Sequence, residues 1–321
     1  MEFIDCYSNN DVYNGIMQEK KLGKLVSGYL FYGNDSESNW QFIHNIARSI
    51  MCDKNGCKSC PDCIKVMEGT HPDIVEFPKG KSLSVEDSKQ VTLEAIKKPM
   101  IANKKIIVIN DIDNSSEEAQ NKLLKTLEEP PQNVIFLVST TNLNKVLPTV
   151  ISRLVKKQVE PLKKEEIEKL FEKNRLNDHF TLAMELGGGY IGKTRNILQN
   201  DSFLKIYTLC QNIVCNLKST ASIIDYLPQT LDKETFNIIL ENLSNMYRDV
   251  LMLKLGQKKL ALNVNLISKF EQVKDEYSIL SLQNIIYNID DANKRQFSNV
   301  AISLILQTLL IKDLEVKYLC K

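Results

Sequence analysis

Four cysteines crowd into residues 52 to 63 of this 321-residue chain. Cys52, Cys57, Cys60 and Cys63 have the spacing C-x4-C-x2-C-x2-C, with Gly56 and Pro61 supplying turns between them. Four thiolates this close can form a tetrahedral shell around Zn²⁺, and an all-cysteine shell leaves no coordination position open for a substrate. The cluster therefore predicts a structural zinc site.

Two other interpretations of the cysteine cluster stay open. An iron–sulfur cluster also uses C-x2-C-x2-C, but the ferredoxin run continues with C-x3-C-P and this one does not. The second interpretation is that the four thiols bind no metal.

Residues 187 to 194, GGGYIGKT, match the phosphate-loop pattern G-x-x-x-x-G-K-[ST] letter for letter. A working phosphate loop follows a strand and leads into a helix, so that its backbone amides wrap the phosphates. This stretch follows the helical pattern of residues 177 to 186 instead. We expect its glycines to end that helix in left-handed backbone conformations, and not to bind phosphate.

The right context for a phosphate loop lies at residues 28 to 50, where a strand pattern, a turn and a helical pattern follow one another. The turn, GNDSESNW, keeps only Gly33 of the motif. Ser38 stands at the second glycine position, Asn39 at the lysine position and Trp40 at the hydroxyl position. Without the lysine the β- and γ-phosphates lose their cation, and without the hydroxyl Mg²⁺ loses a ligand.

A second strand pattern carries a similar loss. In IIVINDID (residues 106 to 113), Asn110 stands where an aspartate would hold Mg²⁺, and Asp111 stands where an activating glutamate is usual. An amide is a weaker, neutral ligand. The sequence thus predicts a nucleotide-binding architecture that uses no ATP in its own site.

The elements that must position these residues alternate along the first half of the chain. Strand patterns lie at 28–33, 73–77, 105–111 and 133–140, and helical patterns at 40–50, 85–98 and 115–129, the last starting with a capping box of Ser115 and Glu118. This alternation predicts a parallel sheet covered by helices.

Beyond about residue 161 the pattern is helical. We expect an α/β core over 1–161, a small helical domain over 162–202 and a larger one over 203–321.

The amino-acid composition limits the kinds of partner that this protein can bind. The 41 basic and 40 acidic residues give a net charge of +1, so contact with nucleic acid must come from a local patch. No run reaches the roughly 18 apolar residues that span a membrane, and the N-terminus lacks a secretory signal pattern. We expect a cytoplasmic protein without a membrane partner.

Several stretches, in order along the chain, resemble the AAA+ clamp-loader subunits of bacterial DNA polymerase III. They are GYLFYG (28–33), the cysteine module, GTHPDI (69–74), NKLLKTLEEPPQNVIFLVSTTN (121–142), LPTVISR (147–153), GGGYIGKTRNIL (187–198) and YRDVLMLKLG (247–256). The resemblance implies an AAA+ core with an inserted zinc module, a helical lid over 162–202, and an all-α collar domain over 203–321 that mediates oligomerisation.

The resemblance is strongest to the family member that does not use ATP itself. It implies a subunit of the polymerase holoenzyme that helps load the sliding clamp onto primed DNA. The implied partners are tau/gamma motor subunits and a clamp-opening delta subunit, with the clamp and primer–template DNA reached through the complex. The implied location is the replisome at the nucleoid.

The resemblance also assigns roles to two basic residues. Arg153 falls at the family's arginine finger, which acts in trans because a rigid, delocalised cation can meet charge developing on a neighbour's transferred phosphoryl group. Leu154 replaces the family's cysteine. The competing interpretation is an arginine paired with a carboxylate at the start of a strand. Lys193 falls at the sensor 2 position, where we expect a vestigial cation or a contact to DNA or another subunit.

Two other functions compete with this one. The alternative within the family is an autonomous ATPase motor that uses either phosphate-loop segment. A zinc-dependent DNA-binding module is the third, weakened by the neutral net charge and by the lack of a recognisable DNA-reading helix.

Overall fold

The computed structural model describes residues 5–7, 10–177, 179–228, 230–296 and 300–319. The chain divides into two compact units, Met1–Glu172 with Gly189–Gly192, and Lys173–Gly188 with Lys193–Lys321. The finer division into core, lid and collar stays a prediction.

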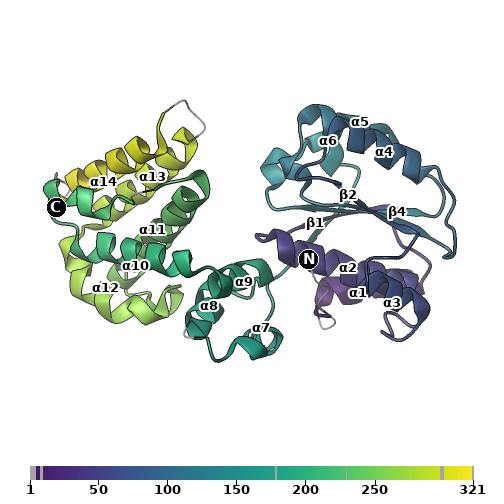
Figure 1. Cartoon of the computed structure of the whole chain (residues 1–321), viewed down its shortest axis with the longest axis horizontal. Coiled ribbons are helices and arrows are strands. Elements are labelled where there is room, and N and C mark those ends of the chain that lie inside the picture. The colour runs from purple at the N-terminus through teal and green to yellow at the C-terminus, as the bar shows by residue number, and fades with distance from the viewer. Residues whose placement is uncertain (1–4, 8–9, 178, 229, 297–299, 320–321) are drawn as a thin grey trace. The chain divides into compact units, whose positions relative to one another are not determined.

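A five-stranded parallel sheet forms the centre of the first unit (Figure 1). Its strands are β1 (Gly28–Tyr32), β2 (Ile74–Phe77), β3 (Lys105–Ile109), β4 (Val134–Thr140) and β5 (Val155–Gln158), in the spatial order β2-β3-β4-β1-β5. Ile109 pairs with Val138, and Tyr32 pairs with Thr140. Because the strands are parallel, the carboxyl ends of β1, β3 and β4 meet at one edge, where ligands of α/β sheets usually bind.

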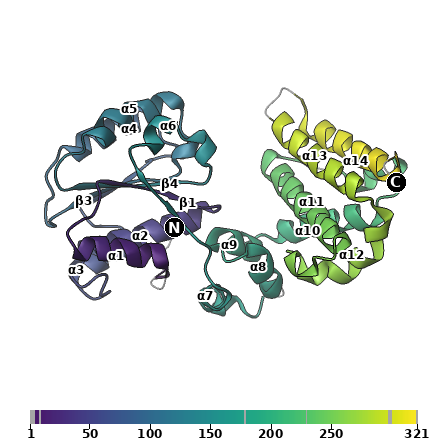
Figure 2. The same ribbon diagram turned by 180° about the vertical axis from the view of Figure 1, so that it is seen from behind.

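Helices cover both faces of this sheet (Figures 1 and 2). One face carries α1 (Asp11–Lys21), α2 (Ser36–Met51) and α3 (Pro61–Met67), and the other carries α4 (Val85–Ala95), α5 (Glu117–Glu128) and α6 (Pro148–Ile151). Every residue of β3 and β4 is buried, which is why both strands read as apolar runs. The predicted α/β fold class is confirmed.

The rest of the chain is helical in the residues described (Figure 2). Its helices are α7 (Lys164–Leu170), α8 (Phe180–Gly187), α9 (Ile191–Gln199), α10 (Asp201–Asn216), α11 (Lys233–Lys254), α12 (Ile267–Val273), α13 (Ile279–Arg295) and α14 (Ile302–Leu319). In the second unit α11 packs against α10 and α13, and α13 packs against α14. None of the helices in the described ranges is long and apolar enough to cross a membrane.

Candidate functional site

The four clustered cysteines converge between α2 and α3. Cys52 is the C-cap of α2, Cys57 lies in the connecting loop, Cys60 is the N-cap of α3, and Cys63 lies in its first turn. Their sulfur atoms all lie within 4.8 Å of one another. The Sγ atoms of Cys52 and Cys60 are 3.7 Å apart, close to the roughly 3.8 Å expected between two sulfurs of a tetrahedral zinc site with Zn–S bonds near 2.3 Å. The four predicted ligands therefore come together with a geometry and chemistry that fit zinc.

The loop around the cysteines is shaped by left-handed backbone. Asn55, Gly56 and Lys58 have φ angles of 54°, 84° and 68°. A Cβ at Gly56 would lie 2.8 Å from Ser49 Oγ, so this turn requires glycine. These tight turns help to bring the four thiols together.

The thiols of the cluster differ in how readily they ionise. Hydrogen bonds from Ser59 lower the pKa of Cys57 to about 6, whereas burial raises the pKa of Cys63 to about 12. Metal ligands must be thiolates, so a bound Zn²⁺ would hold both groups ionised and would release protons on binding.

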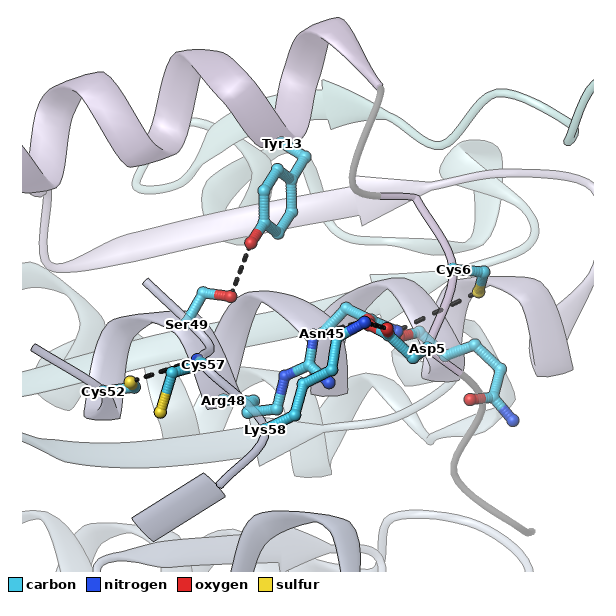
Figure 3. Close-up of polar contacts among 10 residues, drawn as sticks. Asp5, Cys6, Tyr13, Asn45, Arg48, Ser49, Cys52, Cys57 and Lys58 are labelled. Atoms are coloured by element: carbon cyan, nitrogen blue, oxygen red, sulfur yellow. Dashed lines mark hydrogen bonds and ion pairs between the residues drawn. The ribbon is translucent and has the colours of Figure 1, made fainter. Parts of the chain in front are cut away.

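Polar contacts tie the cysteine module to the N-terminal part of the chain (Figure 3). The hydroxyl groups of Tyr13 on α1 and Ser49 on α2 are 2.6 Å apart. Asp5 forms ion pairs with the buried Arg48, at 2.6 Å, and with Lys58 of the cysteine loop. The module is thus anchored to the elements that precede it.

Lys20 on α1 is the cation next to the cluster that the sequence analysis missed. Its Nζ donates to the carbonyl oxygens of Ser49 (2.7 Å) and Cys52 (2.5 Å) and to Asn55 Oδ1 (3.2 Å). Burial lowers the pKa of Lys20, and the neighbouring Cys52 and Asp53 oppose that shift. Zn²⁺ bound by four thiolates is net negative, so this ammonium would stabilise the metal centre and the loop that carries it.

Replacing Lys20 with methionine is expected to weaken zinc binding about tenfold, as loss of outer-shell partners usually does. The measurement is competition for zinc with a chromogenic chelator. Lys21→Met, on an exposed residue of the same helix, is the matched control and should keep wild-type affinity. Equal zinc affinities of the two variants would contradict a role for Lys20.

The segment at the phosphate-loop position is closed by its own side chains. Helix α2 begins at Ser36, and the carboxylate of Asp35 caps it by accepting from Ser38 N (2.8 Å) and Ser38 Oγ (2.6 Å). The same carboxylate accepts from the backbone N–H of Gly192 (2.9 Å), while Ile191 N–H donates to Ser38 Oγ (2.9 Å). A carboxylate therefore occupies the helix N-terminus at which a phosphate loop holds phosphate.

Asn39, at the lysine position, is a buried cross-link between strands. Its Nδ2 donates to the carbonyl oxygens of Gly33 (3.2 Å), which follows β1, and of Thr140 (3.1 Å), which ends β4. A Cβ at Gly33 would lie 2.6 Å from Asn39 Oδ1, so the remaining motif glycine makes room for this asparagine. The position that should project a cation instead joins two backbone segments.

Glu76 on β2 links the two positions that would supply Mg²⁺ ligands. Its carboxylate accepts from Trp40 Nε1 (2.6 Å) and from Asn110 Nδ2, and lies 3.3 Å from His44 Nε2. Burial raises the pKa of Glu76, but the hydrogen bonds with His44, Trp40 and Asn110 outweigh it and hold the pKa below its usual value. Sequence reasoning missed Glu76; the signal was an acidic residue inside an otherwise apolar strand.

Asp111 lies among other carboxylates at the same edge of the sheet. Its backbone is left-handed (φ 47°), and it accepts a hydrogen bond from Ser36 Oγ. Burial raises the pKa of Asp111, and Asp113 and Asp35 add to that rise, against the bond from Ser36. Acidic side chains thus gather where a triphosphate would need cations.

The glycines of the GGGYIGKT stretch end a helix, as predicted, and the stretch then leads into α9, which was not predicted. Gly188 is the left-handed C-cap of α8 (φ 55°), and Gly189 follows with a φ of 82°. No strand precedes the stretch in the described residues 179–187, which form α8 and the turn before it. Lys193 lies on α9, with its Nζ 3.1 Å from Glu241 Oε1.

Arg153 lies between α6 and β5 and is held by two acceptors. Its Nη1 donates to the carbonyl oxygen of Thr149 (2.8 Å), and its Nη2 pairs with Glu128 Oε2 on α5 (2.8 Å). Leu154 is buried against Gly28, where a Cβ would lie 2.5 Å from Leu154 Cδ2. The ion pair foreseen by the competing interpretation is present in the free chain, on a side chain that is 27 % exposed.

Comparison with known proteins shows which proteins this chain resembles. A family model described as DNA polymerase III, delta subunit, matches residues 8–163. The chain is 25% identical to DNA polymerase III subunit delta prime of Bacillus subtilis, over 94% of this chain and 93% of that protein. The chain is therefore similar to a clamp-loader subunit of DNA polymerase III over nearly its whole length. The match to the clamp-loader family model covers the cysteine cluster, the closed phosphate-loop segment and Arg153, and leaves Lys193 outside.

Other clamp-loader subunits are similar over part of the chain. It is 30% identical to subunit gamma of Buchnera aphidicola subsp. Baizongia pistaciae, over 51% of this chain and 46% of that protein. It is 27% identical to subunit tau of Escherichia coli, over 51% of this chain and 26% of that protein. Among solved structures, a gamma subunit-related protein of Thermotoga maritima aligns with a TM-score of 0.43 at 16% identity, covering 94% of this chain and 99% of that one.

Proposed function

We propose that this chain is the delta-prime-type, non-ATPase subunit of a bacterial DNA polymerase III clamp loader, and that it helps load the sliding clamp onto primed DNA. Similarity along nearly the whole length of a delta prime subunit supports this assignment. The proposed partners are tau/gamma motor subunits and a delta subunit, with clamp and DNA reached through the complex. The proposed site of action is the cytoplasmic replisome at the nucleoid.

The observation that carries the non-ATPase role is the position of the Asp35 carboxylate. It accepts N–H groups from the start of α2 and from Gly192, so the donors that would bind phosphate already have an anion. A nucleotide would have to displace a covalently attached carboxylate and approach Asp111 without a lysine from position 39. Both requirements disfavour ATP in this site.

Arg153 is the proposed trans-acting finger. Its present partner, Glu128, is 60 % exposed, and exposed ion pairs are weak enough for a phosphate group to replace. In the assembled clamp loader the guanidinium would stabilise charge on the phosphoryl group that a neighbouring subunit transfers to water. Zinc, bound by the four cysteines, would be structural, and the segments 162–202 and 203–321 would act as lid and oligomerising collar.

The isolated chain is expected to bind and hydrolyse no ATP above background, because its own site lacks the cations that phosphates require. Equilibrium binding of labelled ATP and release of inorganic phosphate measure this, with a tau/gamma subunit as the positive control. Lys193→Ala should change neither result. ATP turnover by the isolated chain that Lys193→Ala abolishes would overturn the proposal and favour the autonomous motor.

A further inference from the structure

The ion pair between Arg153 and Glu128 joins two segments that lie apart in the sequence. Glu128 is the last residue of α5, and Arg153 lies two residues beyond the end of α6. The arginine Nη1 bond to the Thr149 carbonyl oxygen is made within its own segment and does not involve Glu128. If only the glutamate contact were lost, the guanidinium would keep its Nη1 bond to Thr149 and could rotate about that bond.

We propose that Glu128 is a latch that holds Arg153 against its own subunit in the free chain, and that the phosphate of ATP on a neighbouring subunit displaces it. This inference rests on the proposed role of Arg153 as a trans-acting finger. It adds a regulatory residue to that site, since the finger would be paired until a neighbouring ATP offers a better anion.

The chemistry of the two anions favours such an exchange. Glu128 offers Arg153 one contact at 2.8 Å from a carboxylate that is mostly in water. A bound triphosphate offers several charged oxygens in a site shielded from water, where a guanidinium can bind two of them at once. The guanidinium is paired with an oxyanion both before and after the exchange, so neither state contains an unpaired charge.

Glu129 provides a matched control on the same helix end. It is the exposed C-cap residue of α5, and it makes no ion pair with Arg153 among the described residues. Glu128→Gln and Glu129→Gln remove the same charge from neighbouring positions. Their difference isolates the contact to Arg153 from the general effect of one carboxylate fewer.

The test is ATP turnover by a complex reconstituted from this chain, tau/gamma, delta, clamp and primed DNA, at low salt and limiting ATP. Glu128→Gln is expected to raise kcat/KM about two- to fivefold, the scale of an exposed ion pair. Glu129→Gln should match wild type. In the Arg153→Ala background, Glu128→Gln should have no effect.

The outcomes separate the latch from the finger. If Arg153→Ala lowers turnover but Glu128→Gln does not raise it, the latch is overturned and the finger stands. If Glu128→Gln still raises kcat/KM in the Arg153→Ala background, the latch is also overturned, because the effect of the substitution would not depend on the arginine. Unchanged turnover after Arg153→Ala would instead remove the proposed finger and the latch together. Thermal melting of each variant checks that the chain remains folded.

Discussion

Replacing Arg153 with alanine is expected to lower ATP turnover at the adjoining site of a reconstituted clamp loader by on the order of 10³-fold. The reason is that the guanidinium stabilises charge that is greatest in the transition state, so turnover should fall much more than ATP binding does. Pre-steady-state phosphate release measures the turnover, and titration with a fluorescent ATP analogue measures the binding. The fold should survive, because the exposed pair with Glu128 contributes no more than about 1 kcal/mol to stability.

A neighbouring cation serves as the control for Arg153. Lys156 is exposed on β5, and Lys156→Ala removes the same charge without removing the proposed finger. It should leave turnover close to wild type. Arg153→Lys keeps the charge but loses the planar fork, so it should restore only part of the activity. Full DNA-stimulated ATPase after Arg153→Ala would show that the residue has a structural role alone.

Replacing Cys63 with serine is expected to abolish zinc binding and to destabilise the first unit. Cys63 is fully buried and is one of four sulfurs within 4.8 Å, so its loss opens the proposed metal shell. The free energy of unfolding should fall by several kcal/mol, part of the roughly 10–16 kcal/mol that structural zinc gives to isolated zinc-finger peptides. Elemental analysis measures zinc per chain, and thermal melting measures the loss of stability.

Cys210 is the control for the zinc experiment. It is buried on α10, outside the cluster, with its Sγ 3.7 Å from the carbonyl oxygen of Ile239. Cys210→Ser removes a buried thiol and should keep a full complement of zinc. Iron and visible colour in the wild-type protein would support the iron–sulfur interpretation, and a metal-free wild type would leave the four thiols unliganded.

The central strands could be predicted from the sequence because burial on both faces leaves a continuous apolar run. The pattern at 133–140 corresponds to Val134–Thr140, and that at 28–33 to Gly28–Tyr32. Strand β5 was missed because its four residues, VKKQ, are mostly exposed at the sheet edge. Helix α1 was also missed.

Helix α5 shows a smaller error in local reasoning. The predicted capping residue was Ser115, but the N-cap is Ser116, whose Oγ accepts from Ala119 N at 3.2 Å. Ser115 Oγ donates instead to the carbonyl oxygen of Ile112. Two adjacent serines satisfy the same pattern, and only the preceding 3-10 turn (Ile112–Asn114) decides which one caps the helix.

The candidate sites divide according to how far apart in sequence their partners lie. The cysteine cluster could be predicted because its ligands lie in one loop. The roles of Asp35 and Lys20 could not, because Gly192 lies 157 residues from Asp35 and Cys52 lies 32 residues from Lys20. Glu128 and Arg153 lie 25 residues apart, and the competing interpretation foresaw a carboxylate partner for Arg153 without identifying Glu128.

The early start of α2 bears on how the proposed non-ATPase role could be reversed. Only residues 33 to 35 separate β1 from α2, and the helix begins two residues before the position of the second motif glycine. The backbone amides that surround the phosphate in a working phosphate loop here belong to helix α2, which directly follows Asp35. Placing glycine, lysine and threonine at positions 38 to 40 would restore the residue types of the motif. The backbone at these positions would still be helical and would not form a loop. Under the proposed non-ATPase role, the path of the main chain at residues 33 to 38 would have to change, together with the side chains at positions 38 to 40, before this segment could surround a phosphate.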